Sequence, residues 1–245
     1  MFEMAQTRGD EIRALQDRIH GMQRTRLDDR RLPTSSALSE LLPGGALAAG
    51  ASYVIEGSTA LALELLREPS RAGSWCAIVG MPDLGVEAAA AAGIELERLV
   101  LVPHPAEQWF AVVSALIDAV AVVLVRPPTG KRVGEAAATR LAARLRQREA
   151  VLVATGDWPR AQARLTVPES DWAGIGAGFG HLAARQLTVA ASSPAWQGRT
   201  RSRRLWLPDA RGAVSPVAAR EVVVREVVRE VERAAGRASR HAAVG

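Results

Sequence analysis

Five short apolar segments alternate with alanine-rich segments between residues 41 and 158, and this alternation constrains the fold more than any other feature. The apolar segments predict strands at Ser52–Glu56, Trp75–Val79, Leu99–Val102, Ala121–Val125 and Val151–Ala154. The segments between them predict helices at Thr59–Leu66, Leu84–Ala92, Ala106–Asp118 and Val133–Gln147. Because the strands are almost continuously apolar, both faces of the sheet must be covered by helices. That is typical of an α/β fold with a mainly parallel sheet.

The pattern changes after Trp158, where turn-rich links replace the long helical segments. Shorter apolar runs predict strands at Arg164–Val167, His181–Ala191 and Arg203–Leu207. We expect these strands to extend the sheet in antiparallel fashion. Alternate glycines leave one strand face without side chains, which indicates close backbone approach or a flexible loop. They are Gly174, Gly176, Gly178 and Gly180.

Both ends of the chain predict amphipathic helices. The segment Phe2–Arg30 has a narrow apolar stripe, so it is either the first helix of the domain or an arm for assembly. The segment Val217–Ala235 either packs on the sheet or offers its apolar face to a partner. That candidate partner surface consists of Val223, Val224, Val227, Val228 and Val231. We therefore divide the chain into an N-terminal helical arm (1–31), an α/β core (32–209) and a C-terminal helix and tail (210–245).

The composition excludes several classes of protein. Cys76 is the only cysteine, which rules out an intramolecular disulfide or a thiolate metal cluster. It lies in an apolar predicted strand, where a thiol usually behaves as a small buried hydrophobe. The four histidines are scattered, with no second histidine or cysteine three or four residues away, so we expect no metal site. The longest apolar run, Ala119–Val125, is far shorter than the ~20 residues of a membrane span, and we expect a cytoplasmic protein.

The formal net charge of +5 permits contact with nucleic acid without requiring it. All basic Lys and Arg residues except Lys131 are arginines, in a chain rich in alanine, which indicates a compositional bias. One run of arginines falls in a predicted turn between strands, where it could contact phosphates or simply face solvent. These candidate DNA contacts are Arg199, Arg201, Arg203 and Arg204.

The connection after the strand at Ser52–Glu56 is the place where a parallel sheet would carry a phosphate-binding loop. Here the strand leads through Gly57, Ser58 and Thr59 directly into a helix. A working GxxxxGK[ST] loop needs several residues whose amides curl around the phosphate, and a lysine that reaches the outer phosphates. The connection is too short, and Lys131 lies far downstream. We therefore regard these three residues as a vestigial phosphate-loop position and predict no catalytic residue and no nucleotide cofactor.

The order of segments resembles the RecA-like recombinase core over roughly residues 41–192. The likeness begins with the glycine-rich stretch 44–50 before the first strand and continues through 75–79, 92–99 and 121–125. In that family a lysine stands where this chain has a deletion between Gly57 and Ser58.

The same resemblance places two further catalytic positions. The family's catalytic glutamate would fall near Pro82 or Asp83, and the acidic residue that ends its Mg-coordinating strand would fall at Val125 or Arg126. The resemblance therefore implies a degenerate core that has lost its catalysis. It also implies a DNA-facing loop, with candidate contacts at Arg126, Lys131 and Arg132.

Five short motifs resemble one subfamily in particular: residues 75–77, 82–85 and 124–128, Gly156-Asp157-Trp158-Pro159 and the closing 205–209. They are similar to the actinobacterial ImuA-prime accessory proteins of the damage-inducible mutasome. That resemblance implies an adaptor without chemistry of its own in error-prone translesion DNA synthesis, associated with the nucleoid when engaged. Its implied partners are a Y-family polymerase homologue (ImuB) and, indirectly, an error-prone C-family polymerase. RecA-type proteins also dock an N-terminal helix on a neighbouring core, which implies self-association through the first helix.

Two other functions stay open at this stage: a single-strand DNA-binding recombination mediator, and a divergent RecA-like ATPase in which an arginine replaces the lysine. A mediator would need aromatic side chains for base stacking. Trp109 and Phe110 fall in predicted core elements, which leaves mainly Trp158, Trp172 and Trp196 in loops. We therefore expect protein contacts to dominate.

Overall fold

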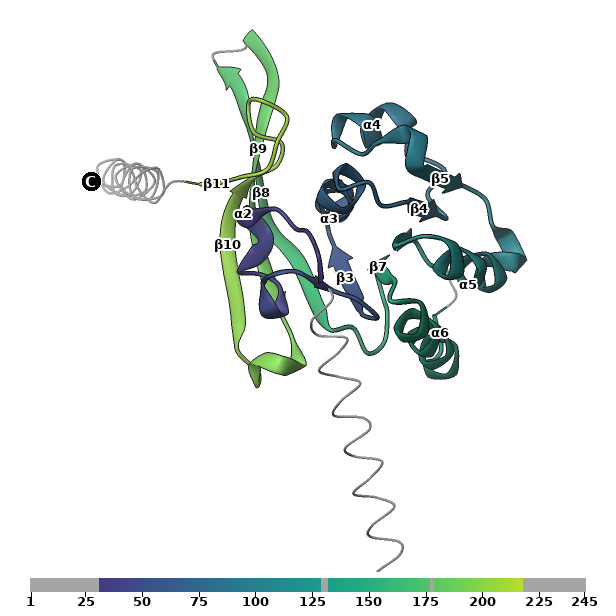
Figure 1. The fold of residues 1–245 in the computed structure, drawn as a ribbon. Helices are drawn as coiled ribbons and strands as arrows, with labels where there is room; N and C mark the ends of the chain where they lie inside the picture. Colours follow the sequence, from purple (N-terminus) through teal and green to yellow (C-terminus); the bar gives the residue numbers. More distant parts are fainter. Residues whose placement is uncertain (1–30, 129–131, 177–178, 218–245) are drawn as a thin grey trace, which may run out of the picture.

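The computed structural model describes residues 31–128, 132–176 and 179–217. Nine of the described strands form one sheet in the order β11-β10-β9-β8-β3-β7-β6-β4-β5 (Figure 1). Their bounds are β3 Ser52–Glu56, β4 Cys76–Val79, β5 Leu99–Val102, β6 Val122–Val125, β7 Val151–Thr155, β8 Ala163–Gly176, β9 Phe179–Ser192, β10 Thr200–Trp206 and β11 Ser215–Pro216. Strands β3 to β7 are parallel to their neighbours, and β8 is parallel to β3. The predicted α/β class is confirmed.

Helices connect the parallel strands where the sequence predicted them. They are α3 (Thr59–Arg71), α4 (Val86–Ala91), the 3-10 turn η3 (Ala106–Gln108) leading into α5 (Trp109–Ala119), and α6 (Glu135–Arg148). Each strand has apolar side chains on both faces: Ile55 of β3 belongs to one core cluster and its neighbour Val54 to the other. The first cluster includes α3, whereas the second includes α5 and α6. Helices therefore cover both faces of the parallel half, as predicted.

The hairpin β8–β9 is much longer than the sequence predicted, and it projects beyond the rest of the sheet in Figure 1. Residues 168–176 are rich in polar residues and glycine, and Pro168 falls inside the register shift between Thr166 and Glu169. Proline within a sheet is confined to edges and bulges because it has no N–H to donate. Pairing with β9 thus overrides weak local strand propensity. The expectation of purely antiparallel strands was wrong for β8, because the direction changes only at β9. Of the four alternate glycines, Gly174 and Gly176 lie at the end of β8 and Gly180 near the start of β9, whereas Gly178 lies outside the described residues.

A short N-terminal segment packs against the antiparallel half. It contains β1 (Arg31–Leu32), α2 (Ser36–Ser39), the 3-10 turn η1 (Pro43–Gly45) and β2 (Leu47–Ala48), and Figure 1 shows α2 beside β10. Fully buried leucines of this segment join the same core cluster as Leu187 and Leu205. The buried Tyr53 hydroxyl accepts a hydrogen bond from the Ala48 backbone N–H at 2.8 Å, which ties the segment to β3.

The sheet continues past residue 209, where the sequence predicted the core to end, because Leu205 of β10 pairs with Pro216 of β11. The predicted N-terminal helix lies outside the described residues, and so do the valines of the candidate partner surface. Within the described ranges, no helix combines the length and the apolar character that crossing a bilayer requires.

Candidate functional site

The connection between β3 and α3 is the centre of the candidate site. It consists of Gly57, with φ +82°, and Ser58, whose hydroxyl accepts a hydrogen bond from the Leu61 backbone N–H at 3.2 Å and so caps α3. Two residues cannot curl their amides around a phosphate. The Ser58 oxygen is also committed to the helix, because an N-cap satisfies one of the free donors of the first turn. The structure thus gives the predicted vestigial position a defined role as a tight turn and helix cap.

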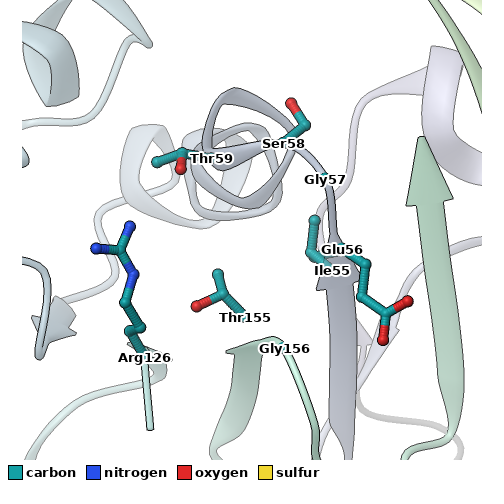
Figure 2. A pocket seen from close by; sticks show the side chains of 8 residues that line it. All are labelled: Ile55, Glu56, Gly57, Ser58, Thr59, Arg126, Thr155 and Gly156. Atoms are coloured by element: carbon teal, nitrogen blue, oxygen red, sulfur yellow. The ribbon is translucent and has the colours of Figure 1, made fainter. Parts of the chain in front are cut away.

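A cavity of about 460 Å³ lies beside this turn, at the carboxyl ends of β3, β6 and β7. Figure 2 shows the residues that line it, with Arg126 and Thr155 across from Ser58 and Thr59. In open parallel sheets, ligands bind at the carboxyl ends of the strands. The cavity therefore lies where an open parallel sheet places its ligands.

Asp83 and Arg126 form an ion pair in which one guanidinium nitrogen lies 2.8 and 3.0 Å from the two carboxylate oxygens. Asp83 follows β4 and Arg126 follows β6, and these strands are neighbours. The resemblance placed the family's catalytic glutamate and its metal-coordinating acid at these two places. In this chain Arg126 stands at the second of these positions, and its positive charge neutralises the negative charge of Asp83. A hydrogen bond from its own backbone and another from Arg126 lower the pKa of the Asp83 carboxyl, which keeps it ionised and paired.

Three further ion pairs surround the same edge of the sheet. Arg160 lies 2.7 Å from Glu135, Arg132 lies 3.5 Å from Asp157, and Arg164 pairs with Glu56. The first two are well exposed and contribute little stability. These ion pairs lower the positive charge that the edge offers to a ligand, because each of the three arginines already has a carboxylate partner. A phosphate arriving at this edge would have to displace those carboxylates.

The candidate DNA contacts do not form one basic surface in the part of the chain that the structure describes. Lys131 lies outside the described residues, and Arg132 is held by Asp157. The turn predicted for the arginine run is shorter than expected: β10 begins at Thr200, so Arg201 also lies in the strand, together with Arg203 and Arg204, which the predicted strand already included.

Within β10, the arginines at alternate positions, Arg201 and Arg203, both contact Glu40 of the N-terminal segment. Arg203 donates to the Glu40 carboxylate at 2.8 Å, and Arg201 donates to the Glu40 carbonyl and stacks on Trp196 at 4.3 Å. Both therefore hold the N-terminal segment on the sheet. Arg204 also has a partner, whereas Arg199 is exposed in the turn before β10.

Other expected features have clear structural outcomes. Cys76 is fully buried, and burial raises the pKa of its thiol to about 12, which makes it unreactive as expected. No group of three metal-ligating side chains occurs among the described residues. Trp158 lies in a loop as predicted, but it is buried, with its ring centroid 6.3 Å from that of Trp109. Trp172 lies in β8 rather than in a loop and is 51% exposed.

Comparison with known proteins agrees with this description. A family model described as the MT3502 N-terminal domain matches residues 40–160. An uncharacterized protein of Mycobacterium tuberculosis, Rv3395c, is 36% identical over 133 residues, which cover 53% of this chain and 65% of that protein. The match thus spans somewhat less than two thirds of the relative's length.

A solved structure shares the architecture. The KaiC-like protein PH0186 of Pyrococcus horikoshii superposes with a TM-score of 0.51 at 10% identity, covering 77% of this chain and 99% of the other. The fold is RecA-like. At this level of identity the likeness concerns the fold alone, and function must be argued from the site.

Proposed function

We propose that this chain is a non-catalytic adaptor in damage-inducible, error-prone translesion DNA synthesis. It would bridge a Y-family polymerase homologue of the ImuB type to other mutasome components and, through that homologue, to an error-prone C-family polymerase. The observation that carries the proposal is the Asp83–Arg126 ion pair at the carboxyl ends of β4 and β6. The resemblance to the RecA-like core implies catalytic positions at or beside these two residues, whose charges here neutralise each other. The partner assignment rests on the resemblance of the short motifs to the ImuA-prime proteins.

Two observations support the absence of ATP chemistry. The β3–α3 turn is too short to wrap a phosphate, and the Ser58 hydroxyl is occupied as a helix cap. Arg126 lines the cavity and is the cation that a divergent ATPase would use in place of lysine. It would first have to leave Asp83.

We expect isothermal titration of the full chain with ATP and Mg²⁺ to show no binding at micromolar nucleotide and no turnover. The reason is the missing amide cradle, because fixed backbone donors supply most phosphate binding in such loops. Micromolar binding would contradict the proposal and favour the divergent ATPase. Loss of that binding in Arg126→Ala would then identify Arg126 as the substitute cation, with Arg132→Ala as the matched control.

We expect the full chain to pull down the Y-family polymerase homologue. If the valine stripe carries the contact, Val224→Glu with Val228→Glu should reduce capture at least about tenfold, because each charge would enter an apolar interface. Ala136→Glu with Ala143→Glu, on exposed positions of α6, is the matched control and should leave capture unchanged. Undiminished capture by the valine variant would remove this helix from the interface.

A single-strand DNA-binding mediator is the second candidate, favoured by the exposed Trp172 with Arg185 5.5 Å from its ring centre. Stacking on such a pair is a sequence-tolerant way to hold single strands. A titration with oligonucleotide at two salt concentrations separates the functions. Tight, strongly salt-dependent binding without capture of the polymerase homologue would favour the mediator.

A further inference from the structure

Helix α5 has an unusual outer face. A surface helix normally carries charged or polar side chains on the side that faces away from the core. The solvent-facing side of α5 is instead apolar throughout. We call it the α5 face, and it consists of Ala111, Ala115 and Ala119, which are exposed, and Val112 and Leu116, which are partly exposed.

The hydroxyl and the carboxylate of α5 do not belong to the α5 face. Ser114 is buried, and Asp118 forms ion pairs with two arginines of α6. Phe110 also faces α6, since Arg140 lies 5.0 Å from its ring centre. The α5 face is therefore on the side of the helix away from α6, near the end of the sheet that β5 forms. The described part of the chain leaves this apolar side open to solvent.

The C-terminal segment offers an apolar surface of matching length. The sequence predicts an amphipathic helix there, and its valine stripe runs from Val223 to Val231. The α5 face runs over the same number of residues, from Ala111 to Ala119, which is about 12 Å along a helix. The small alanine side chains let a second helix approach closely, and branched valines would fill the grooves between them.

The valine stripe cannot reach the α5 face of its own chain. Val217 is held beside β10, because its N–H donates to the Arg204 carbonyl at 3.1 Å. Val223 follows six residues later, so it lies at most about 22 Å away. Helix α5 packs on β4 and β6, and Figure 1 shows it at the opposite end of the sheet from β11. Six strand spacings separate β11 from β6, which is roughly 29 Å.

We infer that the α5 face of one copy is the docking site for the valine stripe of a second copy. The two surfaces differ and lie at opposite ends of the sheet, so the contact is head-to-tail and can repeat from copy to copy. The expected assembly is an open chain or a ring rather than a two-fold dimer. The inference goes beyond the adaptor proposal and does not rest on it, because it concerns only copies of this chain.

Sedimentation velocity of the full chain over a range of concentrations tests the contact. We expect the average mass to exceed that of one copy and to rise with concentration. Ala111→Glu with Ala115→Glu (the α5 variant) and Val224→Glu with Val228→Glu (the valine variant) should each weaken self-association at least about tenfold, because each places charge in an apolar interface. A single copy at every concentration, or undiminished association of either variant, would overturn the inference.

The matched control is Ala136→Glu with Ala143→Glu, which makes the same change at exposed positions of α6. It should associate as the wild-type chain does. An equal loss in this control would show that added negative charge, rather than the α5 face, causes the effect, and would also overturn the inference.

Mixing the two weakened variants tests the head-to-tail geometry. The α5 variant keeps an intact valine stripe, and the valine variant keeps an intact α5 face. We therefore expect the mixture to form a one-to-one dimer that grows no further, because the other two surfaces are blocked. Restored binding would also show that both variants are folded. A two-fold contact through either surface alone is not restored by mixing, so the absence of the dimer would contradict the inference.

The N-terminal segment is the alternative occupant of the α5 face. Leu15→Glu with Ile19→Glu interrupts its predicted apolar stripe and should leave the mass of the full chain unchanged. Loss of assembly in this variant, with assembly retained in the valine variant, would assign the α5 face to the N-terminal segment instead. All of these measurements use this chain alone, so their outcome is distinguishable from failure to capture the polymerase homologue.

Discussion

Replacing Trp109 with alanine is expected to lower the free energy of unfolding by about 3–5 kcal/mol, the usual cost of removing a large buried aromatic side chain. The side chain belongs to the first residue of α5, is 6% exposed and packs in the core cluster that α5 and α6 form with the sheet. Its ring lies against that of Trp158, and its N–H donates to the Arg126 carbonyl at the carboxyl end of β6. The substitution would therefore remove packing and a hydrogen bond together. Urea denaturation followed by circular dichroism measures the change.

The two contributions can be separated with one conservative variant. Trp109→Phe keeps an aromatic ring but leaves the Arg126 carbonyl without its donor, and we expect a loss of about 1–3 kcal/mol. Trp75→Ala is the matched control, because Trp75 is 49% exposed and its removal should cost much less. Equal losses for Trp109→Ala and Trp75→Ala would show that the pair of tryptophans does not support this edge of the sheet.

The strands of the parallel half could be predicted from the sequence almost residue by residue, whereas α3 runs five residues beyond its predicted end. Strand β3 was predicted with its observed bounds, and β5 likewise. Buried parallel strands are apolar on both faces, so they stand out against the alanine-rich helices that separate them. The antiparallel half carried a weaker signal. Residues 168–176 contain proline, acidic residues and glycines, and they become a strand only because β9 pairs with them.

The candidate site could be predicted only in part. The sequence placed the short turn at Gly57 and Ser58, since a strand and a helix lie close on either side. It also placed Asp83 and Arg126 at two family positions, but their ion pair depends on β4 and β6 being neighbours, which the chain order does not reveal. The packing of Glu40 against Arg203 joins residues far apart in the chain, and no local pattern predicts it.

Glu64 carries the second large effect that we expect. It lies on α3, is only 2% exposed, and pairs with Arg67 at 3.5 Å. Burial raises the pKa of its carboxyl to about 7 from the ordinary 4.5, although Arg67 and Ser35 favour the ionised form and act in the opposite direction. Besides these two residues, Glu68 on the same helix faces it and adds to the increase. Among the residues that the structure describes, none forms a hydrogen bond with the Oε1 atom of Glu64, which is consistent with a carboxylate poorly stabilised at high pH.

The direction of the pH effect follows from proton linkage. Because the folded chain holds this proton more tightly than the unfolded chain, protonation of Glu64 stabilises the fold. That contribution is complete below about pH 4.5 and is lost as the pH rises through about 7. The difference between the two pKa values corresponds to about 3 kcal/mol. We therefore expect Glu64→Gln to be up to about 3 kcal/mol more stable than the wild-type chain at pH 8, but nearly equal to it near pH 4.5.

Equilibrium urea denaturation of both proteins between pH 4.5 and pH 8 measures this difference directly. Titration of all other groups is common to the two curves, so it cancels when one is subtracted from the other. Glu97→Gln is the matched control: it removes an exposed carboxylate that lies outside α3 and does not act on Glu64. Its stability should remain parallel to that of the wild-type chain. If the Glu64→Gln curve were parallel as well, Glu64 would titrate in the folded protein as it does in the unfolded chain, and its burial would have no effect on the fold.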